Sequence, residues 1–480
     1  MNDRKGFGSN FGFLMAAVGS AVGLGNIWGF PNKMGANGGF PFLILYLALA
    51  LCCGVIIMLG ELALGRKTGH GAVGAYQSIS KRFKWLGWLG IAAAALIFSF
   101  YSALGGYCLR YVVVNFGNLI GAEFGTNGVG GADVFQGLLS QPDVSIAFAL
   151  AFMLITMLVV MSGVGGGIER VCSVGMPALF FILIICIIRS CTLPGAADGL
   201  KYMFVPGWAV ANGIIDEAPG FWRVLTAAGG QMFFSLSLGA GVMITYGSYL
   251  DKKQDLGKSA MIIVGMDTVV ALMAGLCVIP GRFALDPSGD LGGPELLFIT
   301  MQNVFDKMGP AGPVFGILFY LLVFFAAISS SISMLEVIVA HFCDKAREKG
   351  KGDRRKLYSA IAVVICAALC ALVCADGMGS NHISPAELLG LAGAKLPGWS
   401  TSWLGLFDSV AEGLLMPLGA LLMCLMISWE LKPDALWQEI LLNGENRPWV
   451  YDFFRLCVKY ITPLCMLMIL YGQISDFFIV

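Results

Sequence analysis

Acidic residues inside long apolar stretches are the first candidates for chemistry in this chain. Such positions are Glu61, Asp267, Glu336, Asp408 and Glu412. A charge in an apolar segment costs roughly 2.5–3.5 kcal/mol on membrane-insertion scales, so it usually has a function or a buried partner. Asp267 has no evident basic partner and suits a cation ligand. Glu61 is equally compatible with a structural contact to Gln231 or to a backbone amide.

Two glycine-rich segments, 19–26 and 231–241, interrupt apolar stretches near their middle. A break inside lipid frees backbone groups that must be buried or line a cavity. Freed carbonyls can hold a cation, and helix N-termini can bind a carboxylate. The Ser329–Ser331 triplet could add hydroxyl ligands, although serines in apolar helices more often bond to their own backbone.

Other chemistries are excluded by spacing. Residues 163–167 are glycine-rich but lack the G-K-[ST] sequence of a phosphate-binding loop. The three histidines, His70, His341 and His382, show no metal-ligand spacing, and the 14 cysteines show no C-x-x-C pair. No nucleophile and base are paired, so we do not expect an enzyme.

Composition places these residues in membrane helices. Of 480 residues, 58% are hydrophobic and 12% are charged, against about 25% charged in soluble domains. A membrane span needs about 20 apolar residues, and eleven stretches meet that need. They are 9–33, 38–66, 85–121, 145–162, 168–192, 222–250, 257–284, 310–343, 354–375, 403–430 and 448–477. We therefore predict an all-α integral membrane protein. No cleavage site precedes a polar domain, so a signal peptide is rejected.

Basic residues cluster on one side of these spans, which predicts a cytoplasmic N-terminus and an extracellular C-terminus in the plasma membrane. The densest run, Lys345–Lys356, fits this topology signal, and a lipid-binding patch is the alternative.

The two glycine breaks fall in the first and sixth spans, five apart, as in inverted-repeat transporters. We therefore predict a cytoplasmic segment (1–8), a first repeat (9–192), an extracellular loop (193–221), a second repeat (222–430), and a cytoplasmic loop with the eleventh span (431–480).

Several motifs together resemble the neurotransmitter:sodium symporter family, in particular its bacterial eleven-span members. They are GSAVGLGN at 19–26, Phe30-Pro31, NGG at 37–39, ELALGRK at 61–67, GIERV at 167–171, GAADGLK at 195–201, the stretch 231–250 and FAAISSSI at 325–332. The resemblance implies a leucine-transporter-type fold, a 5+5 inverted repeat plus one extra helix, with sodium ions as co-substrate.

The resemblance also implies two sodium sites and a substrate site at the breaks. One sodium site would comprise Gly19, Val22, Ala326, Ser329 and Ser330, and the other Ala21, Asn26, Ser235 and Asp267. The substrate would contact Ser20, Ala21, Gly23, Leu24, Gly25, Ile97, Tyr101, Phe234, Ser235, Ser237, Ala240, Ser331 and Met334, with Ser333 nearby. Ala240 replaces a bulky residue of many relatives, which favours a large apolar or aromatic substrate.

The chain departs from the family pattern at its gates. The usual outer arginine is Gly29 here, while the acid in the tenth span remains as Asp408, so Lys33 is a candidate replacement. A substrate cation meeting Asp408 is the alternative. The inner gate would involve Arg4, Asp344 and Tyr249, with Phe7 where a tryptophan is common.

A chloride site would be lined by Tyr46, Gln231 and Ser235, with Ala271 in place of a serine. The nearby charge of Asp267 predicts chloride independence.

These observations predict a sodium-coupled symporter that imports a small zwitterion, most simply a hydrophobic or aromatic L-amino acid. The alternatives are transport of a non-proteinogenic amine or cation, and a ligand-binding sensor or channel on the same fold. The oligomeric state does not follow from the sequence.

Overall fold

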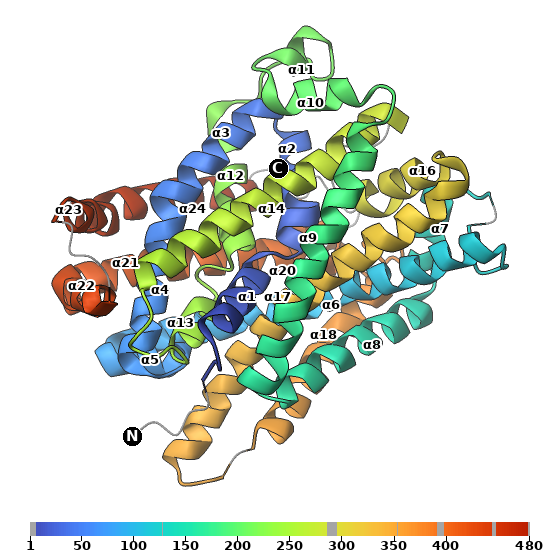
Figure 1. The fold of residues 1–480 in the computed structure, drawn as a ribbon. Helices are drawn as coiled ribbons and strands as arrows, with labels where there is room; N and C mark the ends of the chain where they lie inside the picture. The colour runs from blue at the N-terminus through green and yellow to red at the C-terminus, as the bar shows by residue number, and fades with distance from the viewer. Residues whose placement is uncertain are drawn as a thin grey trace.

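The computed structural model describes residues 6–126, 128–285, 295–352, 354–390, 398–443 and 448–478, and in these ranges the chain is helical without strands. Figure 1 shows the helices as a bundle, with α10 and α11 at one end and α5 at the other. Arg4 was predicted at the inner gate and lies outside the described residues.

The first half of the chain contains nine α-helices. They are α1 (Asn10–Ala21), α2 (Phe30–Ala36), α3 (Phe40–Leu49), α4 (Val55–Thr68), α5 (Ala72–Ile79), α6 (Lys84–Ile120), α7 (Gly131–Leu139), α8 (Pro142–Met161) and α9 (Arg170–Cys191). Short π-helical turns connect some of them, among them η1 (Gly25–Gly29), η2 (Ala50–Gly54) and η4 (Val164–Glu169).

The second half continues with α10 (Ala196–Phe204), α11 (Trp208–Ala211), α12 (Phe221–Leu236), α13 (Val242–Gly247), α14 (Leu256–Leu285), α16 (Met301–Asp306), α17 (Gly312–Glu348), α18 (Arg355–Asp376), α19 (Pro385–Leu388), α20 (Trp403–Asp408), α21 (Met416–Met426), α22 (Pro433–Ile440), α23 (Pro448–Leu456) and α24 (Thr462–Phe478). The π-helical turns here are η5 (Leu296–Thr300), η8 (Ser409–Leu415), η9 (Ile427–Leu431) and η11 (Cys457–Ile461).

Within these described ranges, 9 continuous helical segments are long and apolar enough to cross a membrane. A tenth span is formed by Asn10–Ala21 and Gly25–Ala36, which meet at a bend of 44°. The sixth predicted span, 222–250, is divided between α12 and α13, and neither part alone has the length of a span. Both glycine-rich segments therefore break their helices, as the sequence predicts.

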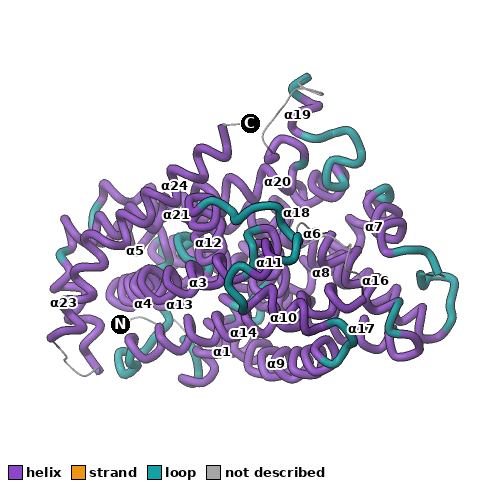
Figure 2. Tube along the Cα trace, turned by 90° about the horizontal axis from the view of Figure 1, so that it is seen from above, coloured by secondary structure: helices purple, strands orange, loops and turns teal. Residues whose placement is uncertain are grey.

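The two broken helices pack in the interior of the bundle. The helix α1 contacts α9, α14 and α17, while η1 contacts α12 and α14. Figure 2, viewed from above, places α12 and α3 inside the bundle, and α23 and α7 at opposite edges. The long helices α6 and α17 pack along each other and complete the wall around the breaks.

Candidate substrate and sodium site

The first break leaves no room for a side chain at Gly23. The helix α1 ends at Ala21, and Val22 adopts an extended conformation. A Cβ atom on Gly23 would lie 2.3 Å from both the Ser330 Oγ and the Tyr101 hydroxyl oxygen. Only glycine fits there without displacing these groups, which explains why the break is built from glycine.

The second break is held by side chains of other spans. After α12, Ser237 adopts a left-handed conformation (φ 53°), as do Gly239 and Gly241. The Ser237 Oγ donates to the Ser20 carbonyl at 3.0 Å, which joins the two breaks. The Gly239 N–H donates to the Glu61 Oε1 at 2.7 Å. Glu61 thus makes the backbone-amide contact considered from the sequence.

The carboxylate of Asp267 lies beside the first break and is fully buried. It accepts hydrogen bonds from the Asn26 Nδ2 at 2.8 Å, the Ser235 Oγ at 2.9 Å and the Tyr46 hydroxyl at 3.2 Å. Among the described residues it forms no ion pair with a basic side chain. Because an isolated buried carboxylate is costly, this oxygen-rich position fits a monovalent cation.

Ser329 and Ser330 of α17 face the other side of the same break. The Ser330 Oγ lies 3.4 Å from the Gly19 carbonyl oxygen and 3.1 Å from that of Ser20. The Ser329 Oγ lies 3.5 Å from the Val22 carbonyl and 3.0 Å from that of Ala326. These neutral oxygens converge as a cation site requires, although Ser329 also bonds back to its own helix at Phe325.

A small cavity lies between the two clusters, with a volume of about 10 Å³, which holds roughly one water molecule. The Tyr101 and Phe234 rings lie 6.3 Å apart at this cavity. The Tyr101 hydroxyl accepts the Leu24 N–H at 2.5 Å. The wall consists of Ala21, Gly23, Gly25, Ile97, Tyr101, Phe234, Ser237, Ser330 and Met334.

Eight of the predicted substrate residues are therefore in the cavity wall, and five are not. Ser20 lies one layer behind it, where its hydroxyl donates to Ser333 at 2.7 Å. Leu24 contributes its backbone N–H to Tyr101, and Ser235 contacts Asp267. Ala240 is packed against α6, since a Cβ on Gly90 would lie 3.1 Å from its backbone. Ser331 is buried without a hydrogen bond among the described residues.

At the end of the site predicted to face outward, the structure contains an ion pair that the sequence did not predict. The Lys33 ammonium contacts the Glu412 carboxylate, with side chains 25% and 9% exposed. The expected partner, Asp408, lies one turn earlier, next to Glu412. At Gly29, the position of the arginine expected from the family pattern, an added Cβ would lie 2.9 Å from the Gln231 Oε1.

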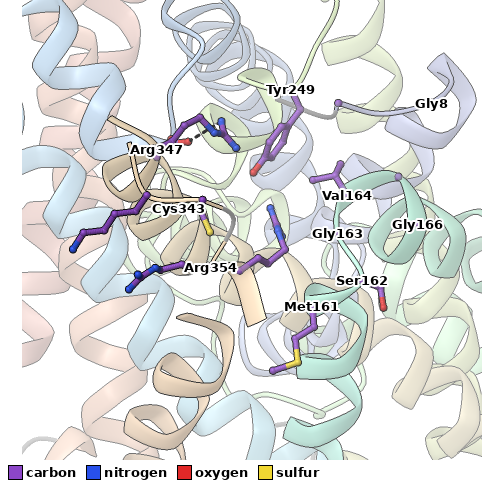
Figure 3. Close-up of a pocket in the computed structure, with 16 residues that line it drawn as sticks. Gly8, Met161, Ser162, Gly163, Val164, Gly166, Tyr249, Cys343, Arg347 and Arg354 are labelled. Carbon is purple, nitrogen blue, oxygen red and sulfur yellow. Dashed lines mark ion pairs between the residues drawn. The ribbon is translucent and has the colours of Figure 1, made fainter. Parts of the chain in front are cut away.

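The opposite end opens into a vestibule of about 600 Å³. In Figure 3, residues Met161–Gly166 form the wall opposite Cys343 and Arg354. Asp344 accepts the Gly71 N–H at 3.1 Å and lies 3.9 Å from Arg347. The ring of Phe7 packs 5.7 Å from that of Tyr246 and 6.3 Å from that of Tyr249.

Sequence reasoning missed a buried ion pair beside this vestibule. The Tyr249 hydroxyl donates to Glu336 at 2.5 Å, and Arg355 binds the same carboxylate at 2.5 and 2.9 Å. Glu336 was singled out as a costly buried acid, but Arg355 was counted only within the basic run. The position of Glu336 inside an apolar span was the available signal for a basic partner.

Comparison with known proteins supports the fold and the sodium ion that the sequence motifs imply. The family model described as "Sodium:neurotransmitter symporter family" matches residues 4–127 and 132–478. The uncharacterized sodium-dependent transporter YhdH of Bacillus subtilis is 36% identical over 477 residues, which cover 97% of each chain. The sodium-dependent nutrient amino acid transporter 1 of Drosophila persimilis is 26% identical over 406 residues, covering 72% of this chain and 60% of that protein.

Among solved structures, MhsT in complex with L-phenylalanine superposes with a TM-score of 0.83 at 34% identity. The match covers 98% of this chain and 100% of MhsT, and it confirms the leucine-transporter-type fold class. These matches agree with the broken helices, the buried carboxylate and the converging neutral oxygens of the site. The chain therefore belongs to the sodium:neurotransmitter symporter family and is a multi-pass, sodium-dependent membrane transporter, not an enzyme.

Proposed function

We propose that the protein imports a hydrophobic or aromatic L-amino acid together with sodium by alternating access. The observation that carries this proposal is the Asp267 carboxylate, which is fully buried beside the cavity without a basic partner among the described residues. A bound sodium ion would neutralise this charge, so that binding of the ion is favoured at a position where an empty site is costly.

Coupling follows from the position of the substrate carboxylate. The Tyr101 hydroxyl lies in the cavity wall and accepts the Leu24 N–H, and Gly25 lies in the same wall, where a helix N-terminus favours an anion. Asn26, Ser235 and Asp267 lie immediately beyond. A sodium ion there would share the substrate carboxylate as a ligand, so each binding event strengthens the other by the same factor.

The second sodium would bind the neutral oxygens of Gly19, Val22, Ala326, Ser329 and Ser330. Movement of positive charge inward is driven by the membrane potential, at about 2.3 kcal/mol per charge per 100 mV. Two sodium ions with one zwitterion would carry a net charge of +2 per cycle.

The side-chain pocket supports an apolar substrate. Its wall includes Ile97, Phe234 and Met334, all buried. MhsT, which shares the fold at 34% identity, was solved with L-phenylalanine. Since the cavity here holds about one water molecule, entry of such a substrate requires these three side chains to move apart.

Chloride independence is proposed from the hydrogen bonds around Asp267. The donors that a chloride ion would use, the hydroxyls of Tyr46 and Ser235, are both directed at this carboxylate. The Gln231 amide donates instead to the Gly25 carbonyl at 2.6 Å. The carboxylate therefore supplies the negative charge that chloride supplies elsewhere in the family.

Gating and topology complete the proposal. Lys33 and Glu412 would close the extracellular side, together with the rings of Tyr101 and Phe234. Asp344 and Tyr249 would close the cytoplasmic side. The N-terminus would be cytoplasmic and the C-terminus extracellular in the plasma membrane, with inverted repeats at 9–192 and 222–430, because basic residues gather on the side of Lys345–Lys356.

The test is binding of radiolabelled amino acids to the purified protein, in sodium and then in potassium, followed by uptake into proteoliposomes. We expect saturable sodium-dependent binding of phenylalanine or leucine, unchanged when gluconate replaces chloride, and uptake that an inside-negative potential accelerates. Binding without uptake would indicate a sensor. Binding of none of the twenty amino acids would move the substrate to other amines, and Gly29 would then be the first residue to examine.

A further inference from the structure

Three polar groups from three different spans converge on one glycine near the outer end. A Cβ atom on Gly230 of α12 would lie 3.1 Å from the Glu412 Oε1, 3.1 Å from the Gln473 Nε2 and 3.7 Å from the Lys33 Nζ. The absent side chain thus creates the space in which the ends of Lys33, Glu412 and Gln473 meet. Gln473 belongs to α24, the eleventh span, which lies outside the proposed ten-span repeat.

The position of α24 is fixed by close packing on both sides of this point. A Cβ on Gly229 would lie 2.4 Å from Ile469, and one on Gly472 would lie 2.4 Å from Thr226, so α12 and α24 approach closely. On the other side, a Cβ on Gly413 of η8 would lie 3.0 Å from the Gln473 Oε1. The amide is therefore held between α12 and η8, next to the turn that carries Glu412.

The chemistry of this amide suits the ion pair. Among the described residues the cluster contains two acids, Glu412 and the neighbouring Asp408, but one cation, Lys33. A neutral amide can donate to a carboxylate oxygen without adding charge, and hydrogen bonds to charged groups are worth about 1.5–3 kcal/mol. Gln473 forms no hydrogen bond among the described residues, so its N–H groups are available to the Glu412 carboxylate, whose Oε1 lies beside the same glycine.

We propose that Gln473 is a positioning residue of the outer gate, which holds the Glu412 carboxylate in line with Lys33 and thereby makes α24 part of the closure. The inference rests on the proposed function, in which this end closes over bound substrate. It assigns a role in gating to a span that the inverted repeat does not require.

The test compares Gln473→Met, which keeps the length but removes the amide, with Tyr471→Phe on the exposed face of the same helix. We expect Gln473→Met to release bound radiolabelled phenylalanine about three- to tenfold faster in sodium, because the amide that can donate to the Glu412 carboxylate is removed. Lys33→Gln should act similarly, and the double variant should be no faster than Lys33→Gln alone, since both changes open one gate. Tyr471→Phe should release substrate at the wild-type rate.

A second measurement keeps the inference independent of the substrate. Hydrogen–deuterium exchange in ligand-free protein should rise in peptides from α2 and η8 of Gln473→Met, and remain unchanged in those from α14. If wild-type protein binds no amino acid, the proposed function fails and this exchange experiment alone decides the gate. Wild-type exchange in Gln473→Met, or release rates that multiply in the double variant, would overturn the inference. Gln473→Asn, which retains an amide, serves where Gln473→Met does not fold.

Discussion

Two oxygen clusters flank the first break, and they differ in charge. The cluster around Asp267 contains a carboxylate with three hydrogen-bond donors directed at it. The cluster around Ser330 contains only neutral carbonyl and hydroxyl oxygens, held 3.0–3.5 Å apart. Both suit a hard cation by ligand type, but only the first brings its own counter-charge.

This difference in charge predicts that the two clusters respond differently to substitutions. A neutral site depends on oriented dipoles and is sensitive to the shape of the break. A charged site depends on one buried group and on the donors directed at it. We therefore expect substitutions at Asp267 to change which ions are required, and those at the neutral site to change affinity only.

The largest effect is expected for Asp267→Ala. Removing a buried charge that a bound cation compensates costs about 3–5 kcal/mol, or more than about 100-fold in sodium affinity. Sodium-dependent binding of radiolabelled phenylalanine should therefore be lost. Asp267→Asn, which keeps the size, should recover binding in chloride but not in gluconate. Undiminished sodium dependence in Asp267→Ala would remove the contrast between the two clusters.

Gly23→Ala should come next, because it disturbs the neutral cluster sterically. Its Cβ would lie 2.3 Å from Ser330 and Tyr101, and overpacking costs about 1–3 kcal/mol. We expect phenylalanine affinity to fall about 5- to 100-fold. The control is Gly265→Ala in α14, where no atom lies within 4 Å of the added carbon. Equal affinities in both variants would mean that the break has room to adjust.

Ser330→Ala removes one neutral ligand and should have a moderate effect. Loss of a hydroxyl contact worth about 1–1.5 kcal/mol lowers sodium affinity by about tenfold. Sodium titration of phenylalanine binding measures this shift, which we expect to be the same in chloride and gluconate. Ser359→Ala, at a buried hydroxyl without a hydrogen bond among the described residues, should leave the titration unchanged. A chloride-dependent Ser330→Ala would contradict the assignment of charge to Asp267.

The smallest effect is expected for Tyr101→Phe, which touches the space between the clusters. The variant loses the 2.5 Å contact with the Leu24 N–H, and a neutral hydrogen bond contributes about 0.5–1.5 kcal/mol. Phenylalanine affinity should decrease about two- to tenfold. Thermal stabilisation by sodium alone should be retained, since neither ion cluster contains this hydroxyl. A loss of that stabilisation would place Tyr101 within a sodium site.

Much of this arrangement could be predicted from the sequence. Each of the nine continuous spans begins and ends within a few residues of its apolar stretch, and both glycine-rich segments interrupt helices. Asn26, Ser235 and Asp267 come together as the family motifs imply. The sequence did not identify Glu412 as the partner of Lys33, nor Arg355 as the partner of Glu336, because those contacts join residues 379 and 19 positions apart.

The amino-acid sequence by itself determined where the helices lie and where they break, because apolar length and local glycine content act over one span. It also determined that buried acids need partners. Only the tertiary structure decided which partners those are, since helix rotation and tilt bring together distant side chains. It also placed Ala240 against α6 and closed the cavity to about 10 Å³, because the volume of a pocket depends on how all its walls pack together.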